Sequence, residues 1–239
     1  IHGYLSKTMT VNIKKVHRII KENNLQVTTY HKNTKKHSTY KGEVGKVADN
    51  IINRNFKSEK PHKKITTDTT EFKYYEKDKA GNYQVKKLYL NPFLDMYNSE
   101  IISYSISKRP NFKAVEEPLN KAIEITKYQK DVIYHSYQGW LYQIPRYVNT
   151  LKENGITQSM SRKGNCLDNS IMENFFSLIK QEMYHKKIFH SYKELESAII
   201  KYIDYYNNER IKEKLDFMSP VEYRLQEEKS KKGMKSNKS

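Results

Sequence analysis

Apolar and polar residues alternate along the chain with two different periods, and the changes between these periods predict its elements. Residues 10–25 repeat apolar side chains at helical spacing, with Thr10 or Asn12 as the residue that caps the helix. Three later stretches, rich in Thr, Tyr, Phe and Ile, alternate at the period of a strand, at residues 64–75, 84–96 and 100–108. Short turns separate these stretches, which predicts an antiparallel meander, although Pro92 is unusual inside a strand.

The second half of the chain alternates between helical patterns and short apolar strands. Helices are predicted at residues 112–127, 140–154, 168–186 and 192–208, and strands at residues 132–134 and 156–160. Gly155 follows the second of these helices and is expected to end it. The resulting order, βββαβαβα, predicts an α/β fold with a mixed five-stranded sheet flanked by helices, preceded by a small helical basic N-terminal region.

The charge of the chain narrows the choice of partner. The 239 residues include 44 Lys and Arg against 27 Asp and Glu, a net charge of +17, which favours a polyanionic partner such as nucleic acid. Codon bias in an AT-rich genome is the alternative explanation, because such a genome enriches Lys, Asn, Ile and Tyr. Bias alone does not explain why several basic residues lie inside the motifs described below.

Composition divides the chain into three regions. Residues 26–62 are polar and basic with weak periodicity, and they predict a linker that leads to a boundary near Pro61. The Lys-rich C-terminal end predicts a disordered tail. We therefore expect a basic helical N-terminal region with its linker at residues 1–58, a core domain at 59–226 and the basic tail at 227–239.

The predicted N-terminal helix carries Lys14, Lys15 and Arg18 on the surface opposite its apolar residues. These cations suit contacts with DNA phosphates, which need charge but no particular pattern, so an ordinary solvated face explains them equally well. The Lys-rich tail has the same two explanations, an addition to non-specific DNA affinity or a plain solvated segment.

Simple counts exclude several classes of protein. The single Cys166 rules out a disulfide framework within the chain and a cysteine zinc site. The chain has no apolar run of about 18 residues and no charged-then-apolar leader, so neither a membrane span nor a secretory signal is predicted. A cytoplasmic location fits this composition. Because the chain begins at Ile1 rather than Met, we expect part of the N-terminus to be missing.

Two acidic residues in different elements are candidates for phosphodiester chemistry, which is served by a pair of divalent ions held by carboxylates. Asp68 lies in the first predicted strand, and Glu173 lies one turn into a helix that Asp168 or Asn169 can cap. Lys180 shares one edge of that helix with Glu173, about 10 Å away, a spacing that suits an acid on a metal and a lysine on the adjacent phosphate. Solvated acids and a solvated lysine are the simpler explanation.

Four sequence blocks carry a resemblance to one family. The blocks are TDTTEF at residues 67–72, HSYQGW at 135–140, SMSRKGNCLDN at 159–169 and YYNNER at 205–210. In this order they resemble the IS3-family insertion-sequence transposases, in particular the second-reading-frame product of the IS150 type. KL at 214–215 and SPVEYR at 219–224 fit as well, so the resemblance covers nearly the whole chain.

The resemblance implies a retroviral-integrase-like catalytic core with the ribonuclease H fold. It also implies a DDE triad that binds two Mg²⁺ ions, with Mn²⁺ as a substitute. A transposase of this kind cleaves a 3′ strand end with water, and the 3′-hydroxyl then attacks a second phosphodiester without a covalent enzyme intermediate. The implied partners are insertion-sequence ends and target DNA, further copies of the chain on that DNA, and the helix-turn-helix product of the upstream reading frame, separate or fused.

The resemblance assigns the triad to three positions, of which one is altered. The first Asp of the family falls on Asp68 and its Glu falls on Glu173. The family places its second Asp in a His-Ser-Asp-Gln-Gly block with 35 residues before the Glu, and here the 35 residues lead back to Tyr137. A tyrosine has a pKa near 10 and is neutral at pH 7, so it is a poor Mg²⁺ ligand, and its ring fills space that metal and water would occupy.

No neighbour of Tyr137 is a good substitute for the missing carboxylate. Asp131 lies about 20 Å upstream along an extended strand. His135 lies on the same face as Tyr137, but a neutral imidazole is a poor choice for Mg²⁺. Asp95 is close enough in the predicted sheet to approach Asp68, yet that position lies outside the triad of the family. A single-base change from GAT to TAT converts Asp to Tyr, and with the missing Met it indicates a decayed or truncated copy.

The same blocks supply residues that we expect to shape the site or to contact DNA. The site-shaping residues are His135, Gln138, Gly139, Asn165 and Asn169, and the DNA contacts are Arg162, Lys163 and Lys180 together with Lys14, Lys15 and Arg18. Gly139 permits a close approach of the backbone to DNA. A purely structural role is the alternative for each of them.

The sequence therefore favours a DNA transposase whose activity is impaired in this copy. Two rival functions remain open. One is a non-catalytic DNA-binding remnant that inhibits transposition by entering mixed assemblies. The other is a ribonuclease H-like nuclease on RNA/DNA hybrids, against which the basic N-terminal region and the YYNNER block argue.

Overall fold

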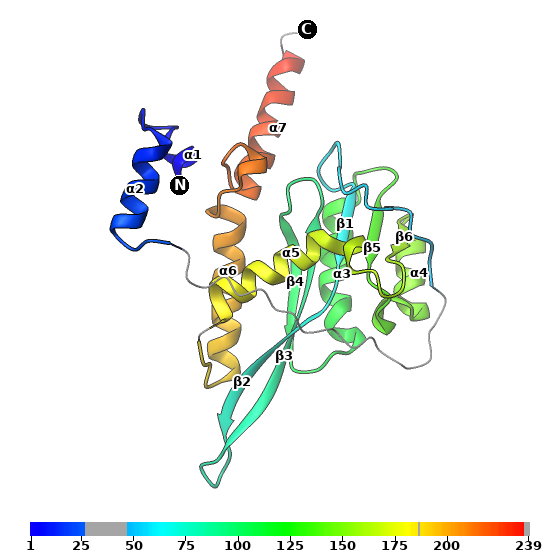
Figure 1. Ribbon diagram of the computed structural model, residues 1–239. Helices are drawn as coiled ribbons and strands as arrows, with labels where there is room; N and C mark the ends of the chain where they lie inside the picture. The colour runs from blue at the N-terminus through cyan, green and yellow to red at the C-terminus, as the bar shows by residue number, and fades with distance from the viewer. Residues whose placement is uncertain (27–46, 186, 237–239) are drawn as a thin grey trace. The chain divides into compact units, whose positions relative to one another are not determined.

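A computed structural model describes residues 1–26, 47–185 and 187–236 of the chain. The chain divides into two compact units, Ile1–Lys35 with Asp204–Ser239, and Lys36–Ile203, whose elements Figure 1 labels. Most of the predicted basic linker, residues 27–46, lies outside the described residues. Among the residues that are described, no helix has the length and apolar composition needed to cross a membrane.

A mixed six-stranded sheet forms the centre of the larger unit, counted over its described residues. Its strands are β1 (Lys64–Thr67), β2 (Thr70–Lys77), β3 (Tyr83–Asp95), β4 (Ile101–Ser107), β5 (Ile133–Ser136) and β6 (Thr157–Met160). β2, β3 and β4 form the predicted antiparallel meander, while β1 pairs antiparallel with β3 and parallel with β5, which pairs parallel with β6. The sheet has one strand more than predicted because the first predicted strand is interrupted at Asp68 and Thr69.

The helices of the two units follow the predicted order. They are α1 (His2–Leu5), α2 (Ile13–Glu22), α3 (Phe112–Thr126), α4 (Pro145–Glu153), α5 (Ser170–Ile179), α6 (Tyr192–Asn208) and α7 (Pro220–Ser236). Shorter 3₁₀ turns occur at Trp140–Tyr142, Cys166–Asn169 and Glu213–Leu215, and a π-helical turn, Lys180–Tyr184, follows α5 directly. The helix predicted at residues 140–154 is divided, because Pro145 lacks an N–H and starts α4 at its first position.

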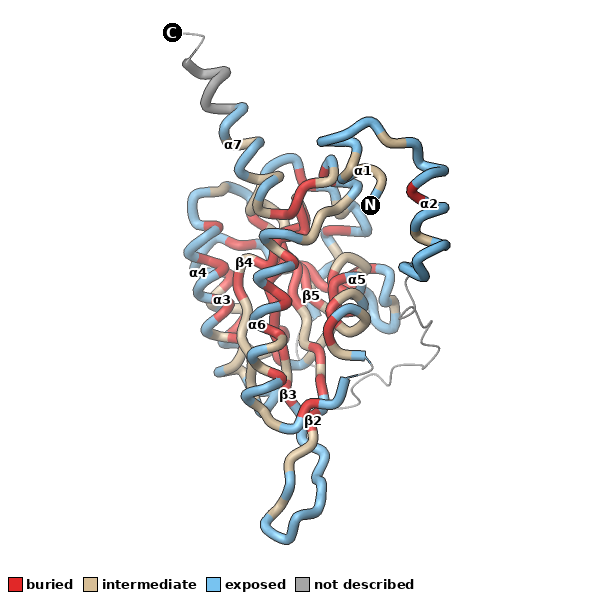
Figure 2. Tube along the Cα trace, turned by 90° about the vertical axis from the view of Figure 1, so that its left-hand side faces the viewer, coloured by how far each residue is buried: buried red, intermediate tan, exposed pale blue. Residues whose placement is uncertain are grey.

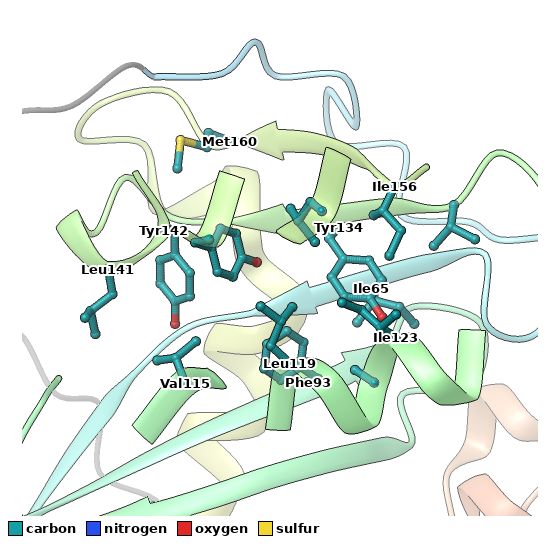
Figure 3. Packing of buried hydrophobic residues seen from close by; sticks show 14 residues of the cluster. Ile65, Phe93, Val115, Leu119, Ile123, Tyr134, Leu141, Tyr142, Ile156 and Met160 are labelled. Atoms are coloured by element: carbon teal, nitrogen blue, oxygen red, sulfur yellow. The ribbon is translucent and has the colours of Figure 1, made fainter. Parts of the chain in front are cut away.

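One face of the sheet carries the main apolar core, which joins it to α3 and α4. The core includes Ile65, Phe93, Val115, Leu119, Tyr134, Tyr142, Tyr147, Leu151, Ile156 and Met160, all buried (Figure 3). Figure 2 shows that buried residues follow the strands and the helices against them, whereas the far end of the β2–β3 hairpin is exposed. The opposite face packs against α5, whose Met172, Phe175 and Ile179 are fully buried.

A proline inside α3 is accommodated by the neighbouring strand. Pro118 has no N–H to donate to the carbonyl of Ala114, four residues earlier. The hydroxyl of Ser105 on β4 donates to that carbonyl instead, and the hydroxyl of Ser103 donates to the carbonyl of Pro118 at 2.7 Å. Serine at alternate positions of β4 therefore supplies hydrogen bonds at the point where the helix lacks one.

Gly155 ends α4 as predicted, and it does so because its backbone has a positive φ of 66°. The N–H of Gly155 donates to the carbonyl of Lys152 at 3.0 Å, and the N–H of Ile156 donates to that of Leu151 at 2.9 Å. These two bonds form a Schellman motif, and the buried side chains of Leu151 and Ile156 are its apolar pair. The motif directs the chain straight into β6.

The free edge of β2 is covered by the segment that follows α5. The N–H of Tyr75 donates to the carbonyl of Phe189 at 2.8 Å. The hydroxyl of Tyr184 accepts from the N–H of Lys73 and donates to its carbonyl, both at 3.0 Å. Backbone groups that would otherwise be unpaired on an outer strand are thus hydrogen-bonded.

In the smaller unit, the side chain of Asn12 caps α2 by accepting from the N–H of Lys14 at 2.8 Å, as one of the two predicted caps. The predicted DNA contacts Lys14, Lys15 and Arg18 are exposed on this helix. α7 extends through Ser236, so helix occupies most of the tail that we predicted to be disordered. The helix-forming residues Glu and Lys dominate residues 227–236, which explains the difference.

Replacing Ser105 with Ala is expected to leave the Ala114 carbonyl without its donor and to lower the free energy of unfolding by about 1–3 kcal/mol. Ser107→Ala on the same strand removes an exposed bond to the carbonyl of Arg109 and is the matched control. Urea unfolding with an unchanged m-value measures both. Equal midpoints for the two variants would contradict the role assigned to Ser105.

Candidate active site

The ends of three parallel strands converge at one edge of the sheet. In the register of the sheet, Thr67 of β1 lies opposite Ser136 of β5, and Ser136 lies opposite Met160 of β6. The residues that follow these strands, Asp68 and Tyr137 among them, therefore leave the sheet side by side. The carboxyl edge of parallel strands is where ligands bind in open α/β sheets.

Asp68 is half-buried at this edge, in the interruption between β1 and β2. Its Oδ1 accepts from the N–H of Thr69 at 2.8 Å, and the hydroxyl of Thr69 donates to Oδ1 of Asn91 at 2.7 Å. Burial raises the pKa of Asp68 to about 7; the bond from Thr69 and the charge of Lys180 oppose this rise, and Glu173 adds to it.

Glu173 and Lys180 approach Asp68 from α5 and the turn after it. Glu173 is exposed in the first turn of α5, and Lys180 starts the π-helical turn with its Nζ 5.6 Å from the ring centroid of Phe72. Burial lowers the pKa of Lys180, and the nearby carboxylates of Glu173, Glu71 and Asp68 oppose that change. The three predicted site residues thus lie within electrostatic reach of one another.

Tyr137 lies within electrostatic reach of both acids. Its pKa is raised by burial first, and the carboxylates of Asp68 and Glu173 raise it further, while a hydrogen bond from the N–H of Gly164 opposes the rise. The side chain is half-buried. The sheet edge therefore holds a neutral phenol where the resemblance expects a metal-binding carboxylate.

The donor set does not fit a pair of Mg²⁺ ions. Among the described residues, no group of three His, Cys, Asp or Glu side chains is arranged to hold a metal ion. Asp95 is not a replacement, because it lies opposite Ile65 in the sheet, and its two oxygens accept from the N–H groups of His62 at 2.7 Å and Tyr97 at 3.0 Å. It ties strand ends together at the opposite end of β1.

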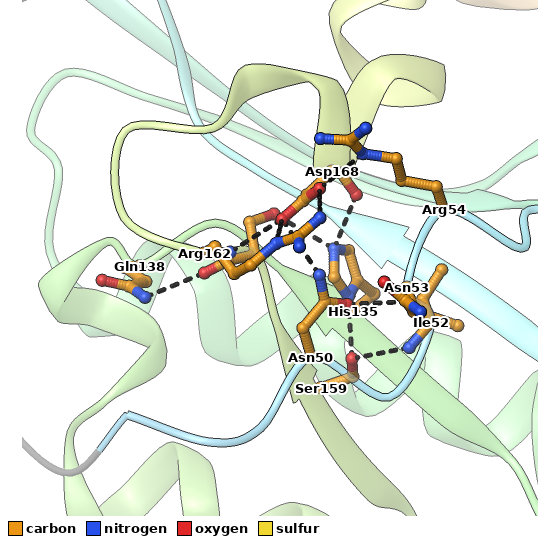
Figure 4. A network of polar contacts seen from close by, with 10 residues as sticks. Asn50, Ile52, Asn53, Arg54, His135, Gln138, Ser159, Arg162 and Asp168 are labelled. Atoms are coloured by element: carbon orange, nitrogen blue, oxygen red, sulfur yellow. Dashed lines mark hydrogen bonds and ion pairs between the residues drawn. The ribbon is translucent and has the colours of Figure 1, made fainter.

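His135 is a structural residue of the site. It is fully buried, and its Nδ1 lies 2.9 Å from the hydroxyl of Ser159. Its Nε2 lies 3.1 Å from the hydroxyl of Ser161 and 3.0 Å from the carbonyl of Asp168 (Figure 4). Burial lowers the pKa of His135 to about 4, so the ring is neutral at physiological pH. Both nitrogens are engaged, which leaves neither to bind a metal.

A buried carboxylate, which the sequence did not single out for this role, holds the loop before α5. The side chain of Asp168 accepts from the backbone N–H of Arg162 at 3.0 Å and from its Nε and Nη2 at 2.8 Å. It also accepts from Nε of Arg54 at 2.9 Å and from Nδ2 of Asn50 at 3.0 Å (Figure 4). Hydrogen bonding from Arg162 is the main reason why the pKa of this carboxyl lies well below its usual range.

The capping role predicted for Asp168 or Asn169 is wrong. α5 begins with no side-chain cap bond, since Asp168 is bound to the two arginines and Oδ1 of Asn169 accepts from the hydroxyl of Thr66 at 2.5 Å. Long-range partners compete successfully with a local cap at both positions. Asn169 nevertheless connects α5 to β1 directly, next to Asp68.

The remaining predicted residues surround the site. Nε2 of Gln138 donates to the carbonyl of Ser161 at 2.9 Å, and a Cβ added at Gly139 would lie 3.3 Å from the ring of Tyr142. Lys163 is exposed and Asn165 is half-buried in the loop between β6 and α5. The site-shaping role of Asn165 and the DNA contact of Lys163 stay predictions. So does the DNA contact of Arg162, whose guanidinium lies in the ion pair with Asp168 at 2.8 Å.

Comparisons with known proteins agree with this architecture. Two family models, each described as an integrase core domain, match residues 58–166 and 173–227. The chain is 46% identical over 222 residues to an uncharacterized transposase-like protein of Haemophilus influenzae, covering 93% of this chain and 97% of that protein. It is 42% identical over 232 residues to the putative transposase InsK for insertion sequence element IS150 of Escherichia coli, covering 94% of this chain and 78% of that protein.

Among solved structures, a chain of the simian T-cell lymphotropic virus intasome in complex with PP2A regulatory subunit B56 gamma resembles this one. The TM-score is 0.50 at 14% sequence identity, over 74% of this chain and 56% of that chain. At this level of identity the likeness concerns the fold, and it agrees with a ribonuclease H-like core.

Asp168→Asn is expected to lower the free energy of unfolding at pH 7 by about 2 kcal/mol. This value lies between those typical of exposed and of buried ion pairs, because Asp168 is buried while both arginines are half-exposed. The folded-state pKa of Asp168 is depressed, so its contribution is present above the unfolded pKa of about 4 and is lost as the pH falls below it. The difference from the unsubstituted chain should therefore be constant from pH 7 to about pH 5 and shrink below about pH 4.

Glu117→Gln is the control for this measurement, because it removes an exposed ion pair with Lys121 on the surface of α3. Thermal or urea unfolding across the pH range measures both variants. A constant difference down to pH 2, or an equal loss in the control, would contradict the contribution assigned to Asp168.

Proposed function

Since the chain belongs to the insertion-sequence transposases of the IS3 family, with their integrase-like core, we propose that it binds insertion-sequence ends and target DNA but is impaired in strand cleavage and joining. In an intact member, three carboxylates hold Mg²⁺, which neutralises charge on the attacking and leaving oxygens of a phosphodiester. Asp68 and Glu173 are our candidates for two of these ligands. Tyr137 stands at the position of the remaining ligand, which is the second Asp of the family.

The observation that carries the proposal is the position of the Tyr137 ring beside both acids. A neutral phenol supplies no charge, so two carboxylates remain where the reaction needs three.

The proposed DNA binding does not depend on the number of carboxylates at the candidate metal site. Lys180 lies beside Asp68 and Glu173, and Lys163 is exposed in the loop that leads to α5. Arg162, and Lys14, Lys15 and Arg18 on α2, add positive charge to a chain with a net charge of +17. We propose that these cations contact phosphates, and that further copies of the chain and the upstream-frame product assemble on the same DNA.

The position of Tyr137 favours a second function as well. A chain that keeps DNA binding and assembly but lacks a catalytic ligand can enter mixed complexes with active transposases and inhibit them. An inhibitor and a weakly active transposase predict different results when the chain is added to an active relative. The inhibitor lowers strand transfer in proportion to its share of the complex.

Tyr137→Asp is expected to restore cleavage and joining of a labelled insertion-sequence end with Mg²⁺ or Mn²⁺, because it supplies the missing negative charge at an intact spacing. Tyr137→Asn is the matched control, since it removes the ring and has the size of Asp but carries no charge. Products from the Asp variant alone would support the proposal. Equal products from the unsubstituted chain and the Asp variant would overturn it.

DNA binding by the unsubstituted chain is expected to weaken steeply with salt, because each neutralised phosphate contributes about −0.9 to the slope of log K against log salt concentration. Five phosphate contacts would give a slope of roughly −4.5 for duplex DNA. Fluorescence anisotropy between 50 and 200 mM salt measures it. A flat response, or no binding at low salt, would remove the DNA-binding part of the proposal.

A further inference from the structure

The outer half of the β2–β3 hairpin projects from the sheet (Figure 1). From Lys77 to Lys87 every residue except the half-buried Asp78 is exposed. Tyr83 and Val85 expose 58% and 56% of their surface, which is unusual for large apolar side chains on a strand. The ring of Tyr83 lies 5.9 Å from the ring of His190, centroid to centroid. A two-stranded hairpin with so little packing is only marginally stable in water, so its exposed length favours a surface that contacts a partner.

The two faces of the hairpin differ. On one face, Phe72 and Tyr74 are buried against the rings of Tyr184 and Tyr192. On the other face, three cross-strand pairs lie in sequence: Lys73 opposite Lys87, Tyr75 opposite Val85, and Lys77 opposite Tyr83. We call these six residues the hairpin strip. Its three pairs contain three lysines, two tyrosine rings and one valine.

The charges of the strip are unfavourable without a partner. Lys73 and Lys87 lie directly opposite each other, and like charges at such positions destabilise a sheet. Glu71 offsets one of them through an ion pair with Lys87 at 2.9 Å. The ammonium of Lys77 lies 5.3 Å from the ring centroid of Tyr83, so it has an aromatic face but no carboxylate among its described contacts. An anionic partner would relieve this repulsion.

The strip begins beside the candidate active site. A cavity of about 180 Å³ is lined by Asp68, Glu71, Tyr89 and Trp140, among others. Glu71 and Tyr89 form the cross-strand pair next to Lys73 and Lys87, so the cavity and the strip are continuous on the same face. From Thr70 to Lys77 the strand extends roughly 23 Å, which matches about seven base pairs of a duplex.

We propose that the hairpin strip binds the phosphate backbone of duplex DNA that runs outward from Asp68. This inference rests on the proposed function, because it extends DNA binding from the sheet edge to a surface outside the residues assigned to it. The charge of Lys73, Lys77 and Lys87 suits a polyanion, since the three lysines share one face of the hairpin. A second copy of this chain, itself strongly basic, would place like charges against the strip.

The test replaces the three lysines together, as Lys73→Gln, Lys77→Gln and Lys87→Gln, and measures binding to a 30-base-pair duplex of arbitrary sequence. The variant is expected to bind at least roughly tenfold more weakly at 0.1 M salt, with a salt slope less negative by about 2.7. A variant with Arg at all three positions keeps the charge and is expected to bind like the unsubstituted chain. Circular dichroism and urea unfolding establish that each variant is folded.

A matched control places Gln at Lys127, Lys130 and Lys152. These lysines are exposed, and they lie near the amino ends of β5 and β6, at the edge of the sheet opposite Asp68. Lys127 forms an ion pair with Glu124, as Lys87 does with Glu71, so each triple variant breaks one surface pair. Binding that weakens in the strip variant but not in the control supports the proposal.

Four other outcomes have distinct meanings. If the unsubstituted chain binds and the strip variant binds equally well, the strip proposal is wrong while the proposed function stands. Equal weakening in the strip and control variants would mean that total charge, and not this surface, determines affinity. If no form binds duplex DNA, the proposed function itself fails. A strip variant that alters self-association and leaves DNA binding unchanged would assign the surface to a second copy and overturn the proposal.

Discussion

The parallel register of β1, β5 and β6 is the constraint on which the candidate site depends. These three strands end at the same level, so Asp68, Tyr137 and the loop after Met160 all lie at one edge of the sheet. The buried charge of Asp168 adds the fourth component. Its ion pairs with Arg54 and Arg162 fix the loop that leads into α5, and so fix the helix that carries Glu173.

Much of this arrangement follows from sequence periodicity, and the rest depends on contacts between distant residues. The order of helices in the larger unit, the antiparallel meander and the stop at Gly155 are local patterns, and the structure has them where the sequence predicts. The ion pairs of Asp168 reach across 114 residues to Arg54, and no local pattern encodes such a partner. For the same reason the sequence predicts a cap at Asp168, where the structure has a buried charge.

Two prolines show how tertiary structure resolves a local conflict. Pro92 lies inside β3 and pairs opposite Tyr104 in the sheet, in a strand that contacts neighbours on both edges. Pro118 lies inside α3, where Ser105 supplies the hydrogen bond that the helix lacks. In both cases the segment keeps its predicted type. Tyr137 shows the same separation of fold from chemistry, since the strand before it and the helix that carries Glu173 are formed although a tyrosine stands where the resemblance expects an aspartate.

The hydrogen bonds that Tyr184 and Phe189 make along the outer edge of β2 restrict how another molecule can approach the hairpin. An edge whose N–H and C=O groups are already bonded cannot accept an added strand, so sheet extension from one chain to the next is closed at this position. A partner at this edge therefore has to be recognised through side chains, whereas the opposite edge, along β3 from Tyr83 to Leu88, pairs with no described strand. Recognition of that kind is governed by charge, which suits the DNA contact proposed for the hairpin strip.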